Sequence, residues 1–250
     1  MVYLASMLEE FMTKLKIDQI LLLIKSIILM NDTNKETIKK KNIDFFSKNF
    51  SYKDSIGKID TYKILYNEIT EIIKNTDRLL DIGHGGTFDY DTTAVNTIVG
   101  LDLDKMIETQ SIPKNVHLEI GSALDVPNKL INFDKVLFVM LIHHLVGKNV
   151  DENLENLSKC IYQCKKTLSK NGELIIVESC VPKWFYSIEK LLFKPTSYFI
   201  NKFMKHPPAF QFTKEIIFEN LIKNGFKEVK IRKIKQGKFI LQYGIKFPTY

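Results

Sequence analysis

Arg78-Leu-Leu-Asp-Ile-Gly-His-Gly-Gly-Thr-Phe88 is the stretch of the chain that decides the fold. Two leucines run directly into Asp81, and glycines follow at positions 83, 85 and 86. Because glycine has no Cβ, a turn of this composition lets the bare backbone approach a ligand closely. The stretch therefore predicts a buried strand that ends in a tight, glycine-rich, ligand-facing turn.

A second apolar segment, 96–102, supports this interpretation because it also ends in an acid. Asp102 lies 21 residues after Asp81. A Rossmann-type sheet places its ribose-binding carboxylate about 20 residues beyond the glycine turn. We therefore expect Asp102 to be the ribose ligand, with Asp104 as the alternative.

Three later segments complete an ordered pattern: 121–127, 133–145 and 168–178. Together with the first two strands, they resemble the successive motifs of class I S-adenosylmethionine (SAM) dependent methyltransferases. The resemblance covers roughly residues 60 to 180. In the first motif of that family an acid is followed by three alternating glycines, and here Thr87 stands in place of the third.

The resemblance implies an α/β fold, in which a seven-stranded, mostly parallel Rossmann-like sheet has helices on both faces. Short apolar segments, as a sheet buried on both faces requires, predict strands at 78–82, 96–102, 116–120, 134–141 and 173–178. Segments 225–234 and 238–247 are expected to form a closing hairpin. Helices are expected over 150–168, with Asn149 and Glu152 as a capping box, and over 213–224.

The segment after the glycine turn departs from the family. Residues 88–94 contain two acids and two aromatic residues, which suit a buried helix face poorly. We expect the helix at this position to be short or displaced, with Asp89 or Asp91 as its cap.

The length of 250 residues favours one domain. We expect an N-terminal helical cap over 1–75, a SAM-binding core over 76–180, a substrate lid over 181–212, and a closing helix and hairpin over 213–250. The lid is inserted before the last two strands, where family members place their substrate-recognition segment.

The resemblance implies SAM as the cofactor and S-adenosylhomocysteine (SAH) as the product. Asp81 and the backbone of the glycine turn would face the amino-acid end of SAM. Ser122 would border the adenine, although Asp125 is an alternative for that contact. The implied cofactor contacts are Asp81, Gly83, His84, Gly85, Asp102, Leu103, Ser122, Ala123, Leu124 and Leu141.

Two histidines, His143 and His144, end the predicted fourth strand, where cofactor and substrate would meet. Histidine can accept a proton near neutral pH, so both are candidate catalytic bases. The alternative is that one packs internally while the other lies near the cofactor. Candidate substrate contacts in the aromatic segment are Trp184, Tyr186, His206 and Phe210, although each aromatic ring is equally well explained as core.

Charge and cysteine content restrict the alternatives. The net charge is +7, with +10 in the last 70 residues and −3 in the first 180, but the chain has only two arginines. Because phosphate recognition favours arginine, we expect a solvated lysine surface and no nucleic-acid groove. Cys160 and Cys164 lie one helical turn apart without a further His or Cys nearby, so we expect packing and no metal site.

Three cysteines and the lack of a signal-peptide pattern lead us to expect a cytoplasmic protein. The longest apolar region, 17–30, is too short and polar to span a bilayer, which leaves only a weak surface association open. The oligomeric state is also open.

The sequence favours methyl transfer from SAM to an O, N or C atom of a small organic molecule. A methyltransferase acting on RNA or protein is the first alternative, because the last third is basic. A nicotinamide-dependent oxidoreductase is disfavoured, since the Asp81 carboxylate would repel a pyrophosphate. A non-catalytic scaffold is disfavoured because Asp81 and Asp102 are both present.

Overall fold

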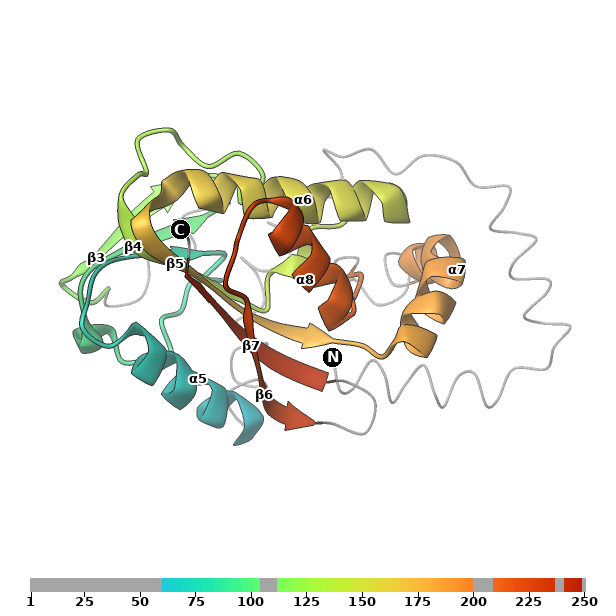
Figure 1. The fold of residues 1–250 in the computed structure, drawn as a ribbon, viewed down its shortest axis with the longest axis horizontal. Helices are drawn as coiled ribbons and strands as arrows, with labels where there is room; N and C mark the ends of the chain where they lie inside the picture. Colours follow the sequence, from blue (N-terminus) through green and yellow to red (C-terminus); the bar gives the residue numbers. More distant parts are fainter. Residues whose placement is uncertain (1–59, 104–111, 200–208, 237–240, 249–250) are drawn as a thin grey trace, which may run out of the picture.

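The structure, a computed structural model, describes residues 60–103, 112–199, 209–236 and 241–248. Seven strands form one sheet in the order β3-β2-β1-β4-β5-β7-β6 (Figure 1). The strands are β1 (Thr76–Ile82), β2 (Val95–Asp102), β3 (Val116–Ile120), β4 (Phe133–Val139), β5 (Leu168–Cys180), β6 (Lys230–Gln236) and β7 (Leu241–Pro248). Asp104, His206 and most of the expected N-terminal cap lie outside the described residues.

The strand order reverses at β1, which lies between β2 and β4. Neighbours from β3 through to β5 pair in parallel, whereas β7 pairs antiparallel with both β5 and β6. Open α/β sheets bind ligands at such a switch point, outside the carboxyl ends of the strands. The predicted mostly parallel α/β class is confirmed.

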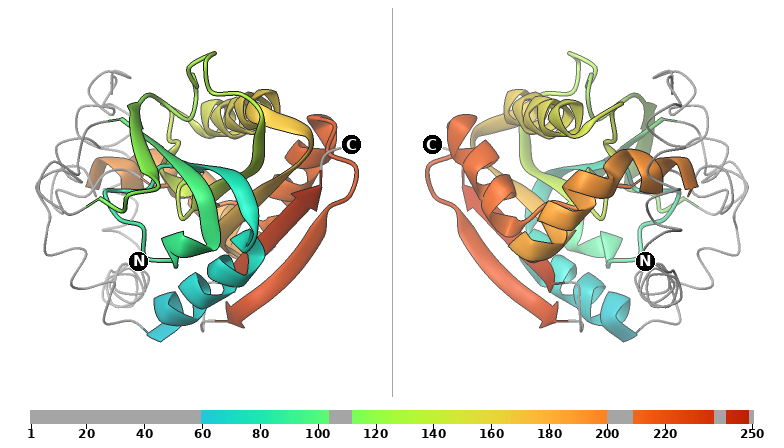
Figure 2. Two further views of the ribbon diagram at one scale, coloured as in Figure 1. Left: turned by 90° about the vertical axis from the view of Figure 1, so that its left-hand side faces the viewer. Right: turned by 90° about the vertical axis from the view of Figure 1, so that its right-hand side faces the viewer.

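Helices cover both faces of the sheet, as predicted (Figure 2). Helix α5 (Asp60–Ile73) packs on one face through Leu65, Ile69 and Ile73, which recur at helical spacing. Helices α6 (Val150–Thr167) and α8 (Lys214–Lys223) pack on the opposite face. Helix α7 (Lys183–Phe199) follows β5.

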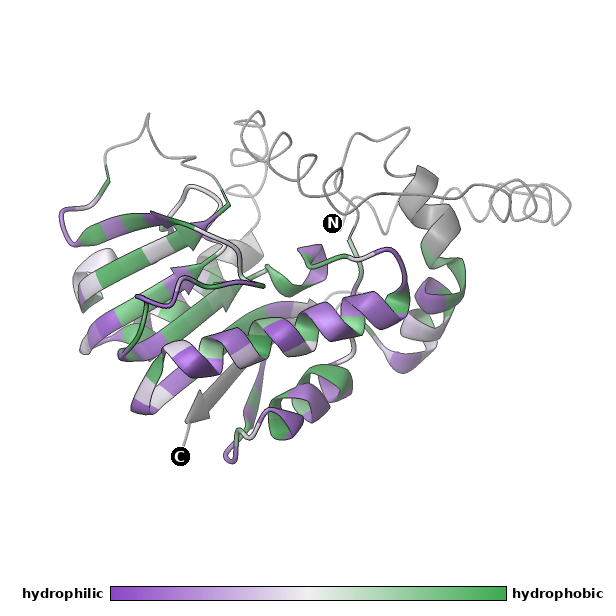
Figure 3. Cartoon of the chain, turned by 90° about the horizontal axis from the view of Figure 1, so that it is seen from above, coloured by the Kyte–Doolittle hydropathy of each residue, from purple (hydrophilic) through white to green (hydrophobic). Residues whose placement is uncertain are grey.

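Adjacent residues of the central strands enter two different apolar clusters. Leu79 packs with α5 and Leu80 packs on the opposite face, and Ile175 and Ile176 divide in the same way. Because both faces are covered, these strands are apolar without alternation, whereas α6 alternates between hydrophilic and hydrophobic residues (Figure 3).

Helix α6 confirms the predicted 150–168 helix closely. Asn149 is its N-cap and accepts the Glu152 N–H at 2.9 Å. The carboxylate of Glu152 accepts the backbone N–H of Lys148, so the reciprocal half of the expected capping box is shifted by one residue. Cys160 and Cys164 are buried as free thiols in the core, as expected for packed side chains.

The connection from β1 to β2 contains no α-helix. Residues 83–91 form a loop, and a single 3₁₀ turn, η1 (Thr92–Ala94), precedes β2. Asp91 caps this turn by accepting the Thr93 N–H at 3.0 Å. The expected short or displaced helix is thus reduced to one turn, because Phe88 and Tyr90 pack against the α5 cluster.

Within the described ranges, no helix has both the length and the apolar character that crossing a bilayer requires.

Candidate functional site

The glycine turn follows β1 at the switch point. Gly83, Gly85 and Gly86 have φ values of +75°, +61° and +83°, in the left-handed region that favours glycine. A Cβ at Gly83 would lie 2.6 Å from Leu141 Cδ1, so Leu141 packs directly against the turn. The structure therefore brings together two segments that the sequence predicted as cofactor contacts.

Asp102, at the end of β2, is hydrogen-bonded to the same turn. Its Oδ2 accepts the Gly85 N–H at 2.9 Å, and its Oδ1 accepts the Leu103 N–H at 2.6 Å. Because each carboxylate oxygen has two lone pairs, both oxygens can accept a further hydrogen bond. The carboxylate is thus fixed by the backbone and retains capacity for two ligand hydroxyls.

Asp81 lies at the end of β1, buried at 2% exposure. Its Oδ2 accepts a hydrogen bond from the Tyr90 hydroxyl at 2.8 Å. Burial raises the pKa of Asp81 to about 7. The hydrogen bond from Tyr90 lowers this pKa, whereas the charge of Asp102 raises it further. A buried acid with a raised pKa is suited to a cationic ligand group, which would favour its charged form.

His84 orders the glycine turn from within. Its ring stacks on Phe88 at 4.9 Å between centroids, and its Nδ1 accepts the Gly86 N–H at 3.0 Å. A Cβ at Gly100 would lie 2.9 Å from His84 Cδ2, so the ring lies directly over β2. Burial lowers the pKa of His84, with the Asp102 charge opposing, and the ring favours its neutral form.

The predicted adenine-side segment forms a tight turn beside β2. The Gly121 N–H donates to the Asp102 backbone carbonyl at 2.8 Å. Ser122 Oγ accepts the Leu124 N–H at 3.1 Å, and the Ser122 carbonyl accepts the Asp125 N–H at 2.9 Å. Ala123 is buried, whereas Asp125 is exposed.

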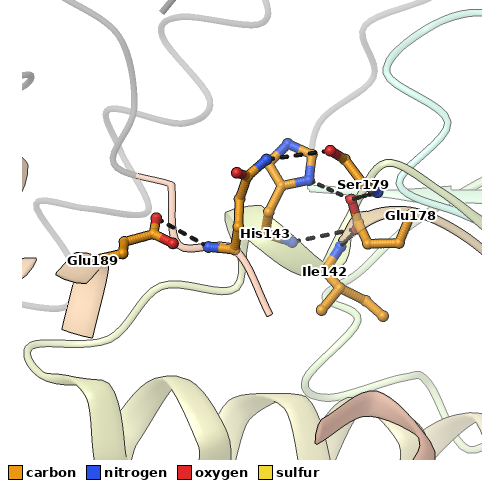
Figure 4. Close-up of polar contacts among 6 residues, drawn as sticks. Ile142, His143, Glu178, Ser179 and Glu189 are labelled. Carbon is orange, nitrogen blue, oxygen red and sulfur yellow. Dashed lines mark hydrogen bonds and ion pairs between the residues drawn. The ribbon is translucent and has the colours of Figure 1, made fainter. Parts of the chain in front are cut away.

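His143 forms a buried pair with Glu178 at the carboxyl ends of β4 and β5 (Figure 4). His143 Nδ1 lies 2.8 Å from Glu178 Oε1. The Ile142 N–H donates to Glu178 Oε2 and the Ser179 N–H donates to Oε1, both at 2.8 Å. These bonds fix the ring of His143. The ring of His144 is half-buried, and its centroid lies 4.0 Å from the centroid of the His143 ring.

A second acid, Glu189, reaches this cluster from α7. The Gln211 side chain donates to Ser179 Oγ at 3.3 Å, and the Gln211 backbone N–H donates to Glu189 Oε1 at 3.2 Å. Within the described part of the chain, Glu189 Oε2 is buried and has no hydrogen-bond partner. Burial raises the pKa of Glu189 to about 8, and the Gln211 hydrogen bond opposes the rise.

Aromatic side chains surround this end of α7. Phe210 is fully buried, and its ring centroid lies 5.6 Å from that of Tyr186 and 5.2 Å from that of Phe193. Trp184 is 56% exposed on another side of the helix, so the structure does not bring it into this group. The predicted contact His206 lies outside the described residues.

A surface groove lies between α6 and α8, and Asp81, Asp102 and His143 are not among the residues that line it. It is lined by Leu154, Tyr162, Ile216 and neighbouring polar side chains. Among the predicted site residues that the structure describes, only Tyr186 reaches it. The groove therefore does not compete with the carboxyl ends of the strands as the candidate site.

Four residues of the site were not identified from the sequence: Tyr90, Glu178, Glu189 and Gln211. Glu178 had a recognisable signal, because it follows an apolar strand as Asp81 and Asp102 do. Glu189 had a weaker one, an acid three residues after Tyr186 and four before Phe193 on one helix. Tyr90 and Gln211 join the site through tertiary contacts that no local pattern indicates.

Three comparisons with known proteins complete the description. No model of a known family matches the chain, and no curated protein matches it. Among solved structures, a putative O-methyltransferase from Nostoc punctiforme aligns over 74% of this chain and 55% of its own, with a TM-score of 0.52 and 16% identity. Human N-acetylserotonin methyltransferase, solved in complex with SAM, aligns over 74% of this chain and 50% of its own, with a TM-score of 0.51 and 12% identity.

The cyclopropane synthase MmaA2 from Mycobacterium tuberculosis aligns over 75% of this chain and 83% of its own, with a TM-score of 0.53 and 14% identity. The chain spans about half the length of the first two proteins. At these identities the likeness establishes the fold, which is that of the class I methyltransferases.

Proposed function

We propose that this protein is a SAM-dependent methyltransferase that acts on a small organic molecule. The observation that carries the proposal is the arrangement of Asp81 and Asp102 around a left-handed glycine turn, at the switch point of a methyltransferase fold. The two carboxylates match the two polar ends that a SAM molecule presents, its amino-acid group and its ribose.

The residues present fit SAM better than a nicotinamide dinucleotide. SAM carries a cationic amine and a sulfonium and has no phosphate, so the buried Asp81 would gain a favourable partner. A dinucleotide instead places its pyrophosphate at a helix N-terminus. Here a loop and one 3₁₀ turn connect β1 to β2, and this connection provides no α-helix for a pyrophosphate.

Each part of the site would hold one part of the cofactor. Asp102 would accept the ribose hydroxyls while the Gly85 N–H keeps its carboxylate in place. The turn at Ser122 and Leu124 would border the adenine. Leu141 would pack along the cofactor beside Gly83.

SAM supplies the electrophilic methyl group when it is bound, so the protein has to orient the acceptor and exclude water. His143 is the better positioned of the two histidine candidates, because Glu178 fixes its ring through Nδ1. Only Nε2 of His143 is then left to exchange a proton with a substrate. His144 stays the alternative base, half-buried against the same ring.

The aromatic group around Phe210 supports a small, partly apolar substrate. Tyr186, Phe193 and Phe210 gather where α7 follows β5, beside the end of the strand that carries Glu178. Pockets for small organic molecules are lined mainly by such side chains. An RNA or protein substrate is the remaining alternative, motivated by the basic last third of the chain.

Methyl transfer from labelled SAM tests the proposal directly. We expect the purified protein to label a small-molecule fraction of a cell extract, and to leave tRNA and protein fractions unlabelled. A thermal-shift series with SAH and NAD, run beside it, should show stabilisation by SAH alone. Strong labelling of tRNA or protein would overturn the small-molecule assignment, and stabilisation by NAD alone would overturn the methyltransferase.

A further inference from the structure

Glu189 is half-buried as a residue, but its carboxyl oxygen Oε2 is buried and unused. Oε1 accepts the Gln211 backbone N–H at 3.2 Å, whereas Oε2 has no hydrogen-bond partner within the residues described. Leaving a buried polar atom without a hydrogen bond is unfavourable, so such atoms in native proteins call for an explanation. A leucine at this position would avoid the cost, which indicates that the acid serves a ligand.

The surroundings of Glu189 define the chemistry of that ligand. Tyr186 and Phe193 lie three residues before and four residues after it, on the same face of α7. Both rings contact Phe210, which precedes the Gln211 that holds Oε1. A small molecule with an apolar body and one hydrogen-bond donor would satisfy both the rings and Oε2.

The position of Glu189 relates it to the proposed methyl-transfer site. Gln211 bonds to Glu189 through its backbone and to Ser179 Oγ through its side chain, and Ser179 adjoins the Glu178 that holds His143 (Figure 4). A continuous polar path therefore runs from the end of β4 to the inner face of α7. A substrate bound at Oε2 would lie at the lid end of this path.

We propose that Glu189 binds the acceptor group of the substrate, and that this group is a hydroxyl or an amine on a small apolar body. The proposal rests on the proposed function and adds to it the chemical class of the substrate. In the reaction, a lone pair of the acceptor oxygen or nitrogen forms the bond to the methyl carbon. The carbon–sulfur bond breaks, its electron pair stays on sulfur, and the acceptor's proton passes to Oε2 of Glu189 in its ionised form, so that Glu189 takes the place of His143 as the base for this acceptor.

Three fragments test this assignment on the full chain saturated with SAH: benzyl alcohol, benzylamine and toluene. They share one apolar body and differ in the donor, and ligand-observed NMR measures their binding. We expect the wild-type protein to bind the alcohol and the amine about five- to tenfold more tightly than toluene, as one hydrogen bond allows. Glu189→Leu should remove this preference without weakening toluene binding.

Glu189→Gln separates the two donors. The glutamine oxygen can still accept a hydrogen bond, so much of the preference for benzyl alcohol should persist, whereas the charge-assisted preference for benzylamine should fall towards the toluene value. Glu71→Gln, which changes an exposed acid on α5, is the control and should behave as wild type. Thermal unfolding of each variant establishes that it is folded.

An unchanged preference in folded Glu189→Leu would overturn the proposal, and so would the failure of all three fragments to bind the wild-type protein. Calorimetry with SAH tests the proposed function independently of the fragment series. If SAH fails to bind, the proposed function fails, and the fragment series on the free protein still decides whether Glu189 receives a donor.

Discussion

At the scale of single residues, two buried carboxyl groups have raised pKa values, Asp81 at about 7 and Glu189 at about 8. Each is protonated more readily in the folded than in the unfolded chain, so each stabilises the folded state fully at low pH and less as pH rises. Neither group is placed for maximum stability of the free protein. That placement is what a ligand-binding role for both acids predicts.

Asp81→Asn should stabilise the ligand-free protein at alkaline pH. The loss of stability caused by Asp81 accumulates between about pH 4 and pH 7 and amounts to at most about 4 kcal/mol, since one pKa unit corresponds to about 1.4 kcal/mol. Urea unfolding at pH 5 and pH 8 measures it. We expect the advantage of the variant to be larger at pH 8, together with at least tenfold weaker SAH binding. An advantage that is equal at both values would contradict the role of ionisation.

Glu189→Gln should show the same sign in a higher pH window. The pKa of Glu189 rises from 4.5 to about 8 through burial, so its stabilising effect is lost between those values. Tyr186 lies on the same face of α7 as Glu189. The pKa of its phenol is raised, mainly by burial and next by the charge of Glu189. The advantage of the variant in urea unfolding should therefore still increase between pH 7 and pH 8.5, where the Asp81 effect has nearly levelled off. A constant difference across that interval would count against a titrating Glu189.

Asp102→Ala should weaken cofactor binding without unfolding the protein. The substitution removes up to two charge-assisted hydrogen bonds to the ribose, worth about 2–4 kcal/mol together, or roughly 30- to 1000-fold in affinity. It also removes the acceptor of the Gly85 N–H, so circular dichroism should accompany the calorimetry. Undiminished SAH affinity in a folded variant would transfer the ribose contact to another residue.

At the scale of elements, the glycine turn depends on two different properties of glycine. At Gly83 a side chain is excluded both by φ and by Leu141, whereas at Gly85 φ is positive but a Cβ would meet no other atom within 4 Å. Gly83→Ala should therefore cost more stability than Gly85→Ala, roughly 2–4 against about 1 kcal/mol. Paired urea unfolding curves measure the difference, and equal costs would show that Leu141 does not press on the turn.

The strands were predictable because their signal is local. Each central strand is a short apolar run that ends near a turn or an acid. The predicted ranges of β1 to β4 match the observed ones to within two residues at either end, whereas β5 begins five residues before the predicted start at 173. The connection from β1 to β2 was less predictable. Its conformation depends on Phe88 and Tyr90 packing against α5, a contact between separate elements that no spacing within 83–94 reveals.

The residues of the candidate site also fall into two groups, those that a local sequence pattern predicts and those that only tertiary contacts reveal. Asp81, Asp102 and the glycines were found because they occupy fixed positions at strand ends, which a motif can specify. Glu189 was missed because its importance comes from burial against Gln211, which lies 22 residues further along the chain. Trp184 was included on residue type alone, and the structure leaves it 56% exposed.

At the scale of the whole molecule, the fold gathers the candidate site residues at one side of the sheet, along the carboxyl ends of its parallel strands. The switch at β1 places the ends of β1, β2 and β4 side by side, and β5 adds Glu178 next to His143. The last two strands close the far side of the sheet, while α7 carries Glu189 and its aromatic neighbours back to the carboxyl ends of the strands. One half of this region therefore carries the residues that we propose for the cofactor, and the other half carries those that we propose for the acceptor.

Isothermal titration calorimetry with SAH, at pH 6 and pH 8 and in buffers of different ionisation enthalpy, tests the central claim most directly. If the cationic amine of SAH pairs with Asp81, binding lowers the pKa of that acid, so protons should be released at pH 6 and few at pH 8. Asp81→Asn should bind more weakly and abolish the release. SAH binding without proton release at pH 6, or an absence of SAH binding while NAD binds in the same titration, would contradict the account.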